Sequence, residues 1–319
     1  MDQHKTLLDI VKSRTKSRSI VAELAAVLNI SYDAAHRRIS GKSKFSLEEG
    51  IIICQRYNLS FDQIFMPGSR VLAEKTKEIR SAAGIADYFK QSIGILSSYK
   101  NSPGAKMYYS AKDIPLFYII GDSLLSKFKL HVWLGLLAAE VELYSFDNFV
   151  FQGPVFEYGK VLRDINKNFE VYEIWNDTTI NSTLQQIYYY YSAGYLNLQH
   201  ALSLLNEVET VLQHVEKRSG AANNRYYLYY NELLILNNNV LVCSADQKAL
   251  FIPYNILGYF ITYDEETCVN TESFFKQQLK HSMPLNNSSM RDRKLFFNRG
   301  SQKINHYRHR IEGDAGLLL

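Results

Sequence analysis

The residues best suited to specific binding lie close together near the start of this sequence. Four of them recur at a spacing that would put them on one face of a helix: Tyr32, Asp33, His36 and Arg37. Their hydroxyl, carboxylate, imidazole and guanidinium groups can form hydrogen bonds with the edges of base pairs. Basic and hydroxyl side chains that suit phosphate groups surround them, namely Ser19, Ser31, Arg38, Lys42 and Lys44. The pattern predicts contacts with DNA bases and with the DNA backbone.

Motifs of known catalytic sites are missing from the sequence. The patterns GxxxxGK[ST], GxGxxG, HExxH and GxSxG do not occur. Gly41-Lys42-Ser43 matches the end of a phosphate-binding loop, but His36 stands where that loop needs its first glycine. His306 and His309 lie one helical turn apart, and two ligands are too few for a stable metal site. We therefore expect no enzymatic activity, no metal ion and no cofactor.

Positive charge is concentrated in the same part of the chain. Residues 1–70 contain 11 Lys and Arg against 7 Asp and Glu, whereas residues 71–319 contain 25 of each. The whole net charge of +4 therefore lies in the first fifth of the 319 residues. A basic head on a neutral body indicates an anionic partner for the head.

The apolar pattern places the candidate binding residues on the second of two short helices. Ser19 and Ser31 suit the caps of these two helices, and Asn29-Ile30 interrupts the pattern between them. Gly41 suits the left-handed residue that ends the second helix, residues 32–40. The side chains expected to pack the pair together are Val21, Leu24, Ala25, Leu28, Ile30, Ala35 and Ile39. Two short helices joined by a tight turn form a helix-turn-helix.

Two flanking helices and a closing segment complete this predicted unit. A first helix precedes Ser19, and Ser46 with Glu49 forms a capping box that opens a fourth helix. The apolar residues expected to face the core from these segments are Leu7, Ile10, Val11, Leu47, Ile51, Cys54, Phe61, Ile64 and Phe65. Pro67-Gly68 is expected to end the unit.

Three segments within residues 4–66 resemble the lambda-repressor/Cro (Xre-type) DNA-binding domain. Residues 24–31 read LAAVLNIS, residues 35–42 read AHRRISGK, and residues 57–65 read YNLSFDQIF. These match the LAxxLgxS pattern of the family, its closing Gly-Lys and its final segment. The resemblance implies a five-helix domain whose third helix, here about residues 32–40, enters the major groove of double-stranded DNA.

The rest of the chain is predicted to be mostly helical. The expected organisation is a helix-turn-helix domain over 1–68, a connecting helix over 69–100 and a dimerisation or effector domain over 101–319. In the last domain we predict helices at about 122–143, 155–168, 179–195, 198–217, 255–262, 269–281 and 289–310, and a β-hairpin at 226–236 and 240–252. The fold class is therefore mainly α, with a larger α+β domain that holds a small β-hairpin or sheet.

Four consecutive tyrosines, Tyr188 to Tyr191, are the most unusual local feature of this body, and Tyr195 follows them. They indicate either a helix that is buried on several sides or an aromatic ligand pocket, and we favour the first interpretation.

Composition indicates a cytoplasmic protein. Cys54, Cys243 and Cys268 are few and widely spaced, which is typical of a reducing compartment. Cys243 and Cys268 are expected in the core. No apolar run reaches the roughly 18 residues that a transmembrane helix needs. The first residues, MDQHK, do not begin a signal peptide. We therefore expect no contact with a membrane.

Two functions of different kinds follow from the sequence. The first is a sequence-specific transcriptional regulator that binds double-stranded DNA as a homodimer, with a second domain that dimerises and is a candidate to sense an unknown effector. Residues 110–115 and the closing Arg-rich helix around Phe296-Phe297 resemble the tails of some bacterial one-component regulators, which supports this function. The alternative is a protein-interaction module or antitoxin-like partner whose head contacts protein.

Overall fold

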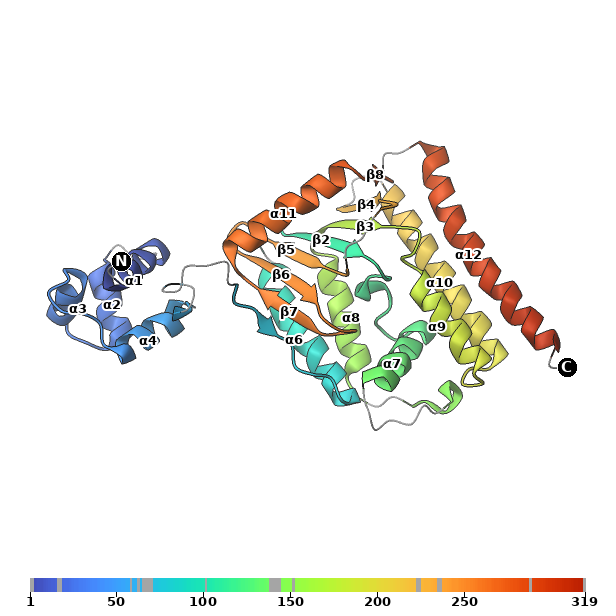
Figure 1. Ribbon diagram of the computed structural model, residues 1–319, viewed down its shortest axis with the longest axis horizontal. Coiled ribbons are helices and arrows are strands. Elements are labelled where there is room, and N and C mark those ends of the chain that lie inside the picture. Colours follow the sequence, from blue (N-terminus) through green and yellow to red (C-terminus); the bar gives the residue numbers. More distant parts are fainter. Residues whose placement is uncertain are drawn as a thin grey trace. The chain divides into compact units, whose positions relative to one another are not determined.

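The computed structural model describes residues 3–15, 19–57, 59–61, 64, 71–100, 102–137, 145–150, 153–221, 225–233, 237–286 and 289–317. The chain divides into two compact units, Met1–Leu72 and Ala73–Leu319 (Figure 1). One cluster of buried apolar residues lies entirely in the first unit, and two others lie entirely in the second. Each unit therefore has a hydrophobic core of its own.

Four described helices form the first unit: α1 (Gln3–Arg14), α2 (Ile20–Leu28), α3 (Tyr32–Ile39) and α4 (Leu47–Tyr57). Their buried residues are Leu7, Leu8, Val11, Leu24, Leu28, Ala35, Ile53 and Cys54. The expected fifth helix falls on residues that lie largely outside the description, and so do Phe65 and Pro67-Gly68. The number of helices in this unit therefore remains a prediction.

Local signals set the ends of α2 and α3 as the sequence predicts. The side chain of Ser19 accepts a hydrogen bond from the N–H of Ala22, and that of Ser31 accepts one from the N–H of Ala34. Between the helices, Asn29 takes the left-handed conformation with φ 54°. Such a residue reverses the chain within a few positions, because its short polar side chain tolerates this conformation.

The inward face of α4 differs from the prediction. Leu47 is 73% exposed and Ile51 is 42% exposed, whereas Ile53 and Cys54 are buried. In α1, likewise, Leu8 is buried in place of Ile10. The physical reason in α4 is that Ile51, Ile52 and Ile53 are consecutive. Only packing against the other helices selects which of three equally apolar side chains faces the core.

A single mixed sheet organises the second unit. Its eight described strands are β1 (Glu74–Lys75), β2 (Lys106–Ala111), β3 (Glu170–Trp175), β4 (Tyr226–Tyr230), β5 (Val240–Cys243), β6 (Lys248–Pro253), β7 (Tyr259–Thr262) and β8 (Met283–Pro284). Their order is β1-β7-β6-β5-β2-β3-β4-β8. The neighbouring strands β2, β3 and β4 are parallel, and the other pairs are antiparallel.

Helices connect the parallel strands and cover both faces of the sheet. The described helices of this unit are α6 (Ala82–Lys100), α7 (Leu124–Leu137), α8 (Val155–Asn166), α9 (Asn181–Ser192), α10 (Leu198–Gly220), α11 (Glu265–Lys280) and α12 (Met290–Leu317). Short 3-10 turns lie at Leu116–Tyr118 and Phe146–Asn148. The helices α7 and α8 link β2 to β3, and α9 and α10 link β3 to β4. One face packs against α11, and α12 lies along α10 (Figure 1).

A row of tyrosines crosses the parallel strands on the face that α11 covers. Tyr108, Tyr172 and Tyr227 are register partners on β2, β3 and β4. Their ring centroids are 5.0 Å and 4.8 Å apart, and both pairs are stacked. Phe275 of α11 continues the stack on Tyr108 at 5.6 Å. Stacked aromatic pairs of this kind help to fix strand register.

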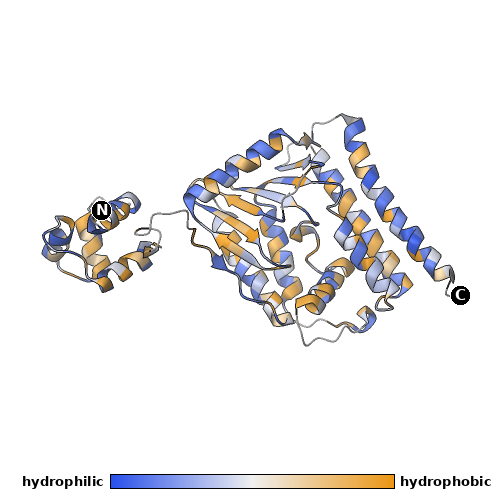
Figure 2. Ribbon diagram, in the orientation of Figure 1, coloured by the Kyte–Doolittle hydropathy of each residue, from blue (hydrophilic) through white to orange (hydrophobic). Residues whose placement is uncertain are grey.

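This sheet corrects the predicted fold class. The second unit is an α/β domain built on an extended mixed sheet, not a mostly helical domain with a small hairpin. The expected hairpin is wrong, because β4 pairs with β3 and β8, whereas the hairpin partner of β5 is β6. Residues 255–262, expected to be helical, contain β7 instead. Figure 2 shows that the strands are largely apolar, as in a sheet buried on both faces.

Residues 69–100, expected to be a connecting helix, are mostly part of the second unit. Within them, β1 pairs with β7, and the helix α6 packs on α8. Ile85 and Phe89 of α6 are buried in the core of this unit. No described helix combines the length and the apolar composition that crossing a membrane requires.

Candidate nucleic-acid interface

The exposed face of α3 carries all four predicted base-contacting residues. Tyr32 is 58% exposed, although it is aromatic. Asp33, His36 and Arg37 are exposed as well. The opposite face of the helix packs into the core through Ala35, which is completely buried. The helix contacts the core through a small side chain and presents long polar side chains on its other face. This arrangement suits a helix that lies in a groove of a partner.

The predicted phosphate-contacting serines lie at the N-termini of α2 and α3. Their hydroxyl oxygens are used as helix caps, with N–H to oxygen distances of 3.3 Å at Ser19 and 3.2 Å at Ser31. The N-terminus of a helix attracts anions because its first N–H groups point outward and the helix dipole is positive there. The helix ends, rather than the hydroxyl groups, are therefore what these positions offer to a phosphate.

Two exposed lysines follow α3 on a sharply turned segment. Gly41 has φ 72°, in the left-handed region, and its N–H donates to the carbonyl of Arg38 at 3.1 Å. The N–H of Ser43 then returns to the carbonyl of Arg37 at 3.1 Å. These bonds fold the chain back onto the end of α3 and leave Lys42 and Lys44 exposed.

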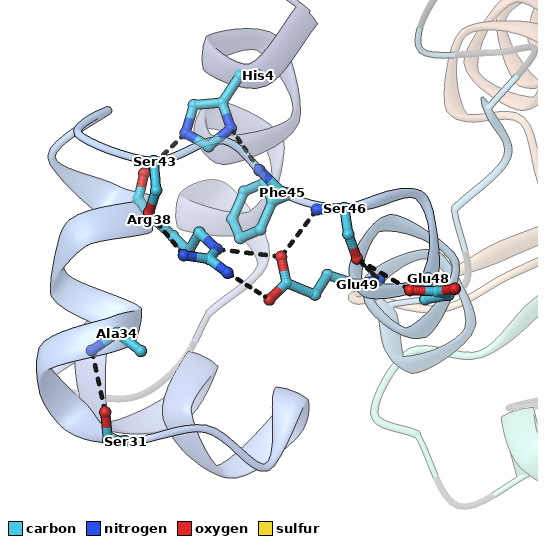
Figure 3. A network of polar contacts seen from close by, with 9 residues as sticks. All are labelled: His4, Ser31, Ala34, Arg38, Ser43, Phe45, Ser46, Glu48 and Glu49. Atoms are coloured by element: carbon cyan, nitrogen blue, oxygen red, sulfur yellow. Dashed lines mark hydrogen bonds and ion pairs between the residues drawn. The ribbon is translucent and has the colours of Figure 1, made fainter.

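The side chain of Arg38 is committed to contacts within the first unit (Figure 3). Its Nε and Nη2 donate to the two carboxylate oxygens of Glu49 at 3.1 Å and 3.0 Å. Its Nη1 donates to the hydroxyl of Ser43 at 2.6 Å. This fork-shaped pairing satisfies the guanidinium inside the protein. Arg38 therefore differs from Lys42 and Lys44, since its charge is neutralised by Glu49.

Glu49 joins this pair to the start of α4. Its carboxylate accepts a hydrogen bond from the N–H of Ser46 at 2.9 Å, and its own N–H donates to the hydroxyl of Ser46 at 3.1 Å. The reciprocal bonds confirm the predicted capping box. Burial alone raises the pKa of Glu49, but the hydrogen bonds from Arg38 and Ser46 outweigh it and hold the pKa below its ordinary value.

His4 was not among the residues that the sequence singled out. Its Nε2 lies 2.7 Å from the carbonyl oxygen of Arg38, and its Nδ1 accepts a hydrogen bond from the N–H of Phe45 at 3.3 Å. The partners are 34 and 41 positions away in the chain. No motif marks residue 4, so only the folded structure brings it to the segment that carries the lysines.

Among the described residues of the second unit, Glu173 and Lys129 are buried and have hydrogen-bond partners within the protein. Glu173 accepts hydrogen bonds from Tyr118, Trp175 and Tyr226, at 2.8 Å from the last two. Burial raises its pKa. Lys129, which is 1% exposed, donates to the side chains of Thr183 and Gln186, and burial lowers its pKa. These groups are satisfied by protein partners, as the core of a stable domain requires.

The cationic surface of α12 lines a shallow hollow of about 300 Å³ with Asp177, Arg299, Lys303 and His306 on its wall. Arg299 pairs with the carboxylate of Asp177 at 3.5 Å, and Lys303 donates to the backbone carbonyl of the same residue. His309 faces Glu312 at 3.7 Å. Among the described residues, no group of three or more His, Cys, Asp and Glu side chains could hold a metal ion.

The tyrosine run of α9 packs between neighbouring elements. Tyr190 is buried against Phe128 and His131 of α7. Tyr188 donates to Asp314 of α12 and lies under the guanidinium of Arg310 at 3.9 Å. These contacts show packing on more than one side of the helix, whereas Tyr189 of the same run is 59% exposed. The free thiols of Cys243 and Cys268 are buried, as the sequence predicts.

Comparison with known proteins adds no relative. No family model matches the chain, and no curated protein or solved structure is detectably similar to it.

Proposed function

We propose that this protein is a sequence-specific DNA-binding transcriptional regulator whose first unit reads the major groove with α3. The observation that carries the proposal is the exposed polar face of α3, continued by two exposed lysines on the turn after Gly41. Base-reading groups and phosphate-binding cations are adjacent on one element. Such a helix following a tight turn is the part of a helix-turn-helix that enters the major groove.

The roles of the residues follow from their chemistry. Arg37 can contact guanine through two parallel hydrogen bonds, and Asp33 can accept one from the amine of cytosine. Tyr32 and His36 contribute further base contacts. Lys42 and Lys44 bind phosphates and fix the register of the helix, together with the N-termini of α2 and α3. Arg38 does not contact a phosphate in this proposal, because Glu49 neutralises its charge. Its hydrogen bond to Ser43 instead helps to hold the segment that carries the lysines.

The second unit supplies the dimer in this proposal. A single helix in the groove offers modest specificity, and a two-fold dimer reads two half-sites at once. Residues 71–319 carry no net charge, so their self-association meets no overall repulsion. The same unit is the candidate site for an effector. The buried free thiols Cys54, Cys243 and Cys268 fit a reducing compartment, which supports a place in the cytoplasm.

The test compares two single substitutions that remove the same charge. Arg37→Ala should weaken binding to the preferred site by about 1–3 kcal/mol and relax the preference at one base position. Lys42→Ala should weaken binding to all duplexes about equally. Arg56→Ala, which removes an exposed arginine from the end of α4, is the charge-matched control. The preferred site comes from selection among genomic fragments. If Arg37→Ala and Lys42→Ala act alike on preferred and random DNA, the assigned roles are wrong.

One observation favours the alternative, a head that contacts protein. Leu47, Ile51 and Ile52 of α4 are exposed apolar side chains, and Ile52 lines a surface groove together with Val27 of α2. Exposed apolar residues that gather on one face often mark a protein interface. Ile51→Ser with Ile52→Ser should leave binding to DNA unchanged if α3 is the interface. If this double variant no longer binds a protein partner, although the residues of α3 are unaltered, the alternative is supported.

A further inference from the structure

His4 holds both ends of the segment that follows α3 (Figure 3). The ring nitrogen Nδ1 faces the backbone N–H of Phe45 and must therefore be the acceptor. In the neutral ring the proton then lies on Nε2, which donates to the carbonyl of Arg38 at 2.7 Å. The imidazole also lies against the ring of Phe45, with centroids 4.6 Å apart. One side chain of α1 thus joins the end of α3 to the approach of α4.

A third contact holds the middle of the same segment. The guanidinium of Arg38 donates to the hydroxyl of Ser43, and Glu49 fixes that guanidinium from α4. The segment from residue 38 to residue 45 is therefore tied at its start, middle and end. Lys42 and Lys44 lie between these ties and have exposed side chains. Their backbone positions are set by contacts that neither lysine makes itself.

We propose that His4 is a positioning residue for DNA binding, which sets the backbone segment that presents Lys42 and Lys44 to phosphates. This inference rests on the proposed function of the first unit. Phosphate contacts fix the register of a recognition helix on the duplex. A segment that is already ordered loses less conformational freedom on binding, and this raises affinity without any new contact. His4 itself does not touch DNA in this arrangement.

The experiment measures binding of the full-length protein to a short random-sequence duplex over a salt series at constant pH. His4→Leu should weaken binding about tenfold, which corresponds to about 1.4 kcal/mol. The slope of log K against log salt should become shallower by about 1 to 2 per head, because two phosphate contacts loosen in each head. Ser13→Ala is the control on the same helix, since the exposed hydroxyl of Ser13 bonds only locally, to the carbonyl of Ile10. This control should bind like the unaltered protein.

One further variant separates positioning from general loss of stability. His4→Asn keeps an acceptor near the position of Nδ1. His4→Asn should retain the protection of the Phe45 amide against hydrogen exchange and restore most of the affinity, whereas His4→Leu should lose both. A variant that is only partly unfolded would bind less but keep the salt slope of the unaltered protein.

Three outcomes would overturn the inference. His4→Leu could bind as tightly as Ser13→Ala, it could bind more weakly with an unchanged salt slope, or it could keep full protection of the Phe45 amide. Each of these leaves the proposed function standing if the unaltered protein binds duplex DNA. If the unaltered protein binds no duplex at low salt, the proposed function falls and the positioning role falls with it.

Discussion

Gly41 offers the sharpest test of how the first unit is built. It is the residue after α3 that turns the chain toward the exposed lysines, and its φ of 72° lies where L-residues are strained. A Cβ added there would meet no heavy atom within 4 Å. The effect of Gly41→Val therefore comes from backbone strain alone, without a steric clash. This separates the conformational cost from any packing cost.

The size of the effect follows from these two facts. A left-handed conformation costs an L-residue about 1–2 kcal/mol, and a β-branched side chain lies toward the upper end of the ~1–3 kcal/mol range for strained positions. The loss of glycine also removes freedom from the unfolded chain and returns about 0.4–1 kcal/mol. The net destabilisation by Gly41→Val is thus about 1–2 kcal/mol. Gly41→Asn should cost less, because asparagine tolerates this conformation.

The assay uses the position of the tryptophans. The chain has two, Trp133 and Trp175, and both lie in the second unit. Tryptophan fluorescence in urea therefore follows the second unit, whereas far-ultraviolet circular dichroism follows the helices of both units. With an m-value of about 1 kcal/mol/M for a small unit, Gly41→Val should lower the urea midpoint of the first unit by about 1–2 M. The fluorescence transition should not move, and DNA binding should weaken.

Equal midpoints for the unaltered protein, Gly41→Asn and Gly41→Val would refute the strain argument. An equal shift of the tryptophan transition would show instead that the two units unfold together.

Three further predictions concern pH and assembly. The pKa of Glu49 is held below its ordinary value. The charged carboxylate therefore adds its full stabilisation to the first unit above about pH 4.3, the ordinary pKa of a glutamate. This stabilisation is lost as the pH falls through the lowered pKa. Glu49→Gln should cost about 1–3 kcal/mol at neutral pH and flatten the acid part of a stability profile measured by circular dichroism. Burial, with a smaller contribution from the charge of Lys127, lowers the pKa of His131, so the second unit loses stability as pH falls below about 6.5. His131→Phe should flatten this decline in the tryptophan transition, and an unchanged decline would contradict the assignment. In sedimentation at tens of micromolar, residues 73–319 should be dimeric and residues 1–72 monomeric, and a dimeric head or a monomeric second unit would contradict the assembly.

The sequence predicts best where structure depends on short-range signals. Ser19 and Ser31 cap helices through bonds to residues three positions away, and Gly41 adopts a conformation that its own backbone favours. Such signals are complete within a few residues, so they can be read without knowledge of the fold. The apolar pattern of α3 also predicts which face of the helix is exposed, and the burial of Ala35 on the opposite face confirms it.

The sheet depends on pairing between strands far apart in the sequence, so its extent cannot be predicted from local patterns. Tyr226 pairs with Val171 in parallel register, across two intervening helices. The strands β2 and β5 are buried along nearly their whole length, so they show no alternation of polar and apolar residues that would mark them.

The same limit applies to the support of the candidate interface. The ion pair of Arg38 with Glu49 spans 11 positions, and the two bonds of His4 span 34 and 41. Nothing local in the sequence links these residues. The exposure of the groups proposed to touch DNA could thus be predicted, whereas the contacts that hold them in place could not.

The salt dependence of binding to random duplex DNA tests the central claim most directly. If Lys42 and Lys44 each neutralise one phosphate, log K for one head should fall with log salt at a slope of about −2, and at about −4 for a dimer that engages both heads. Lys42→Ala should make the slope per head shallower by about 1. The absence of binding by the full-length protein at low salt, or binding with a slope near zero, would contradict the account.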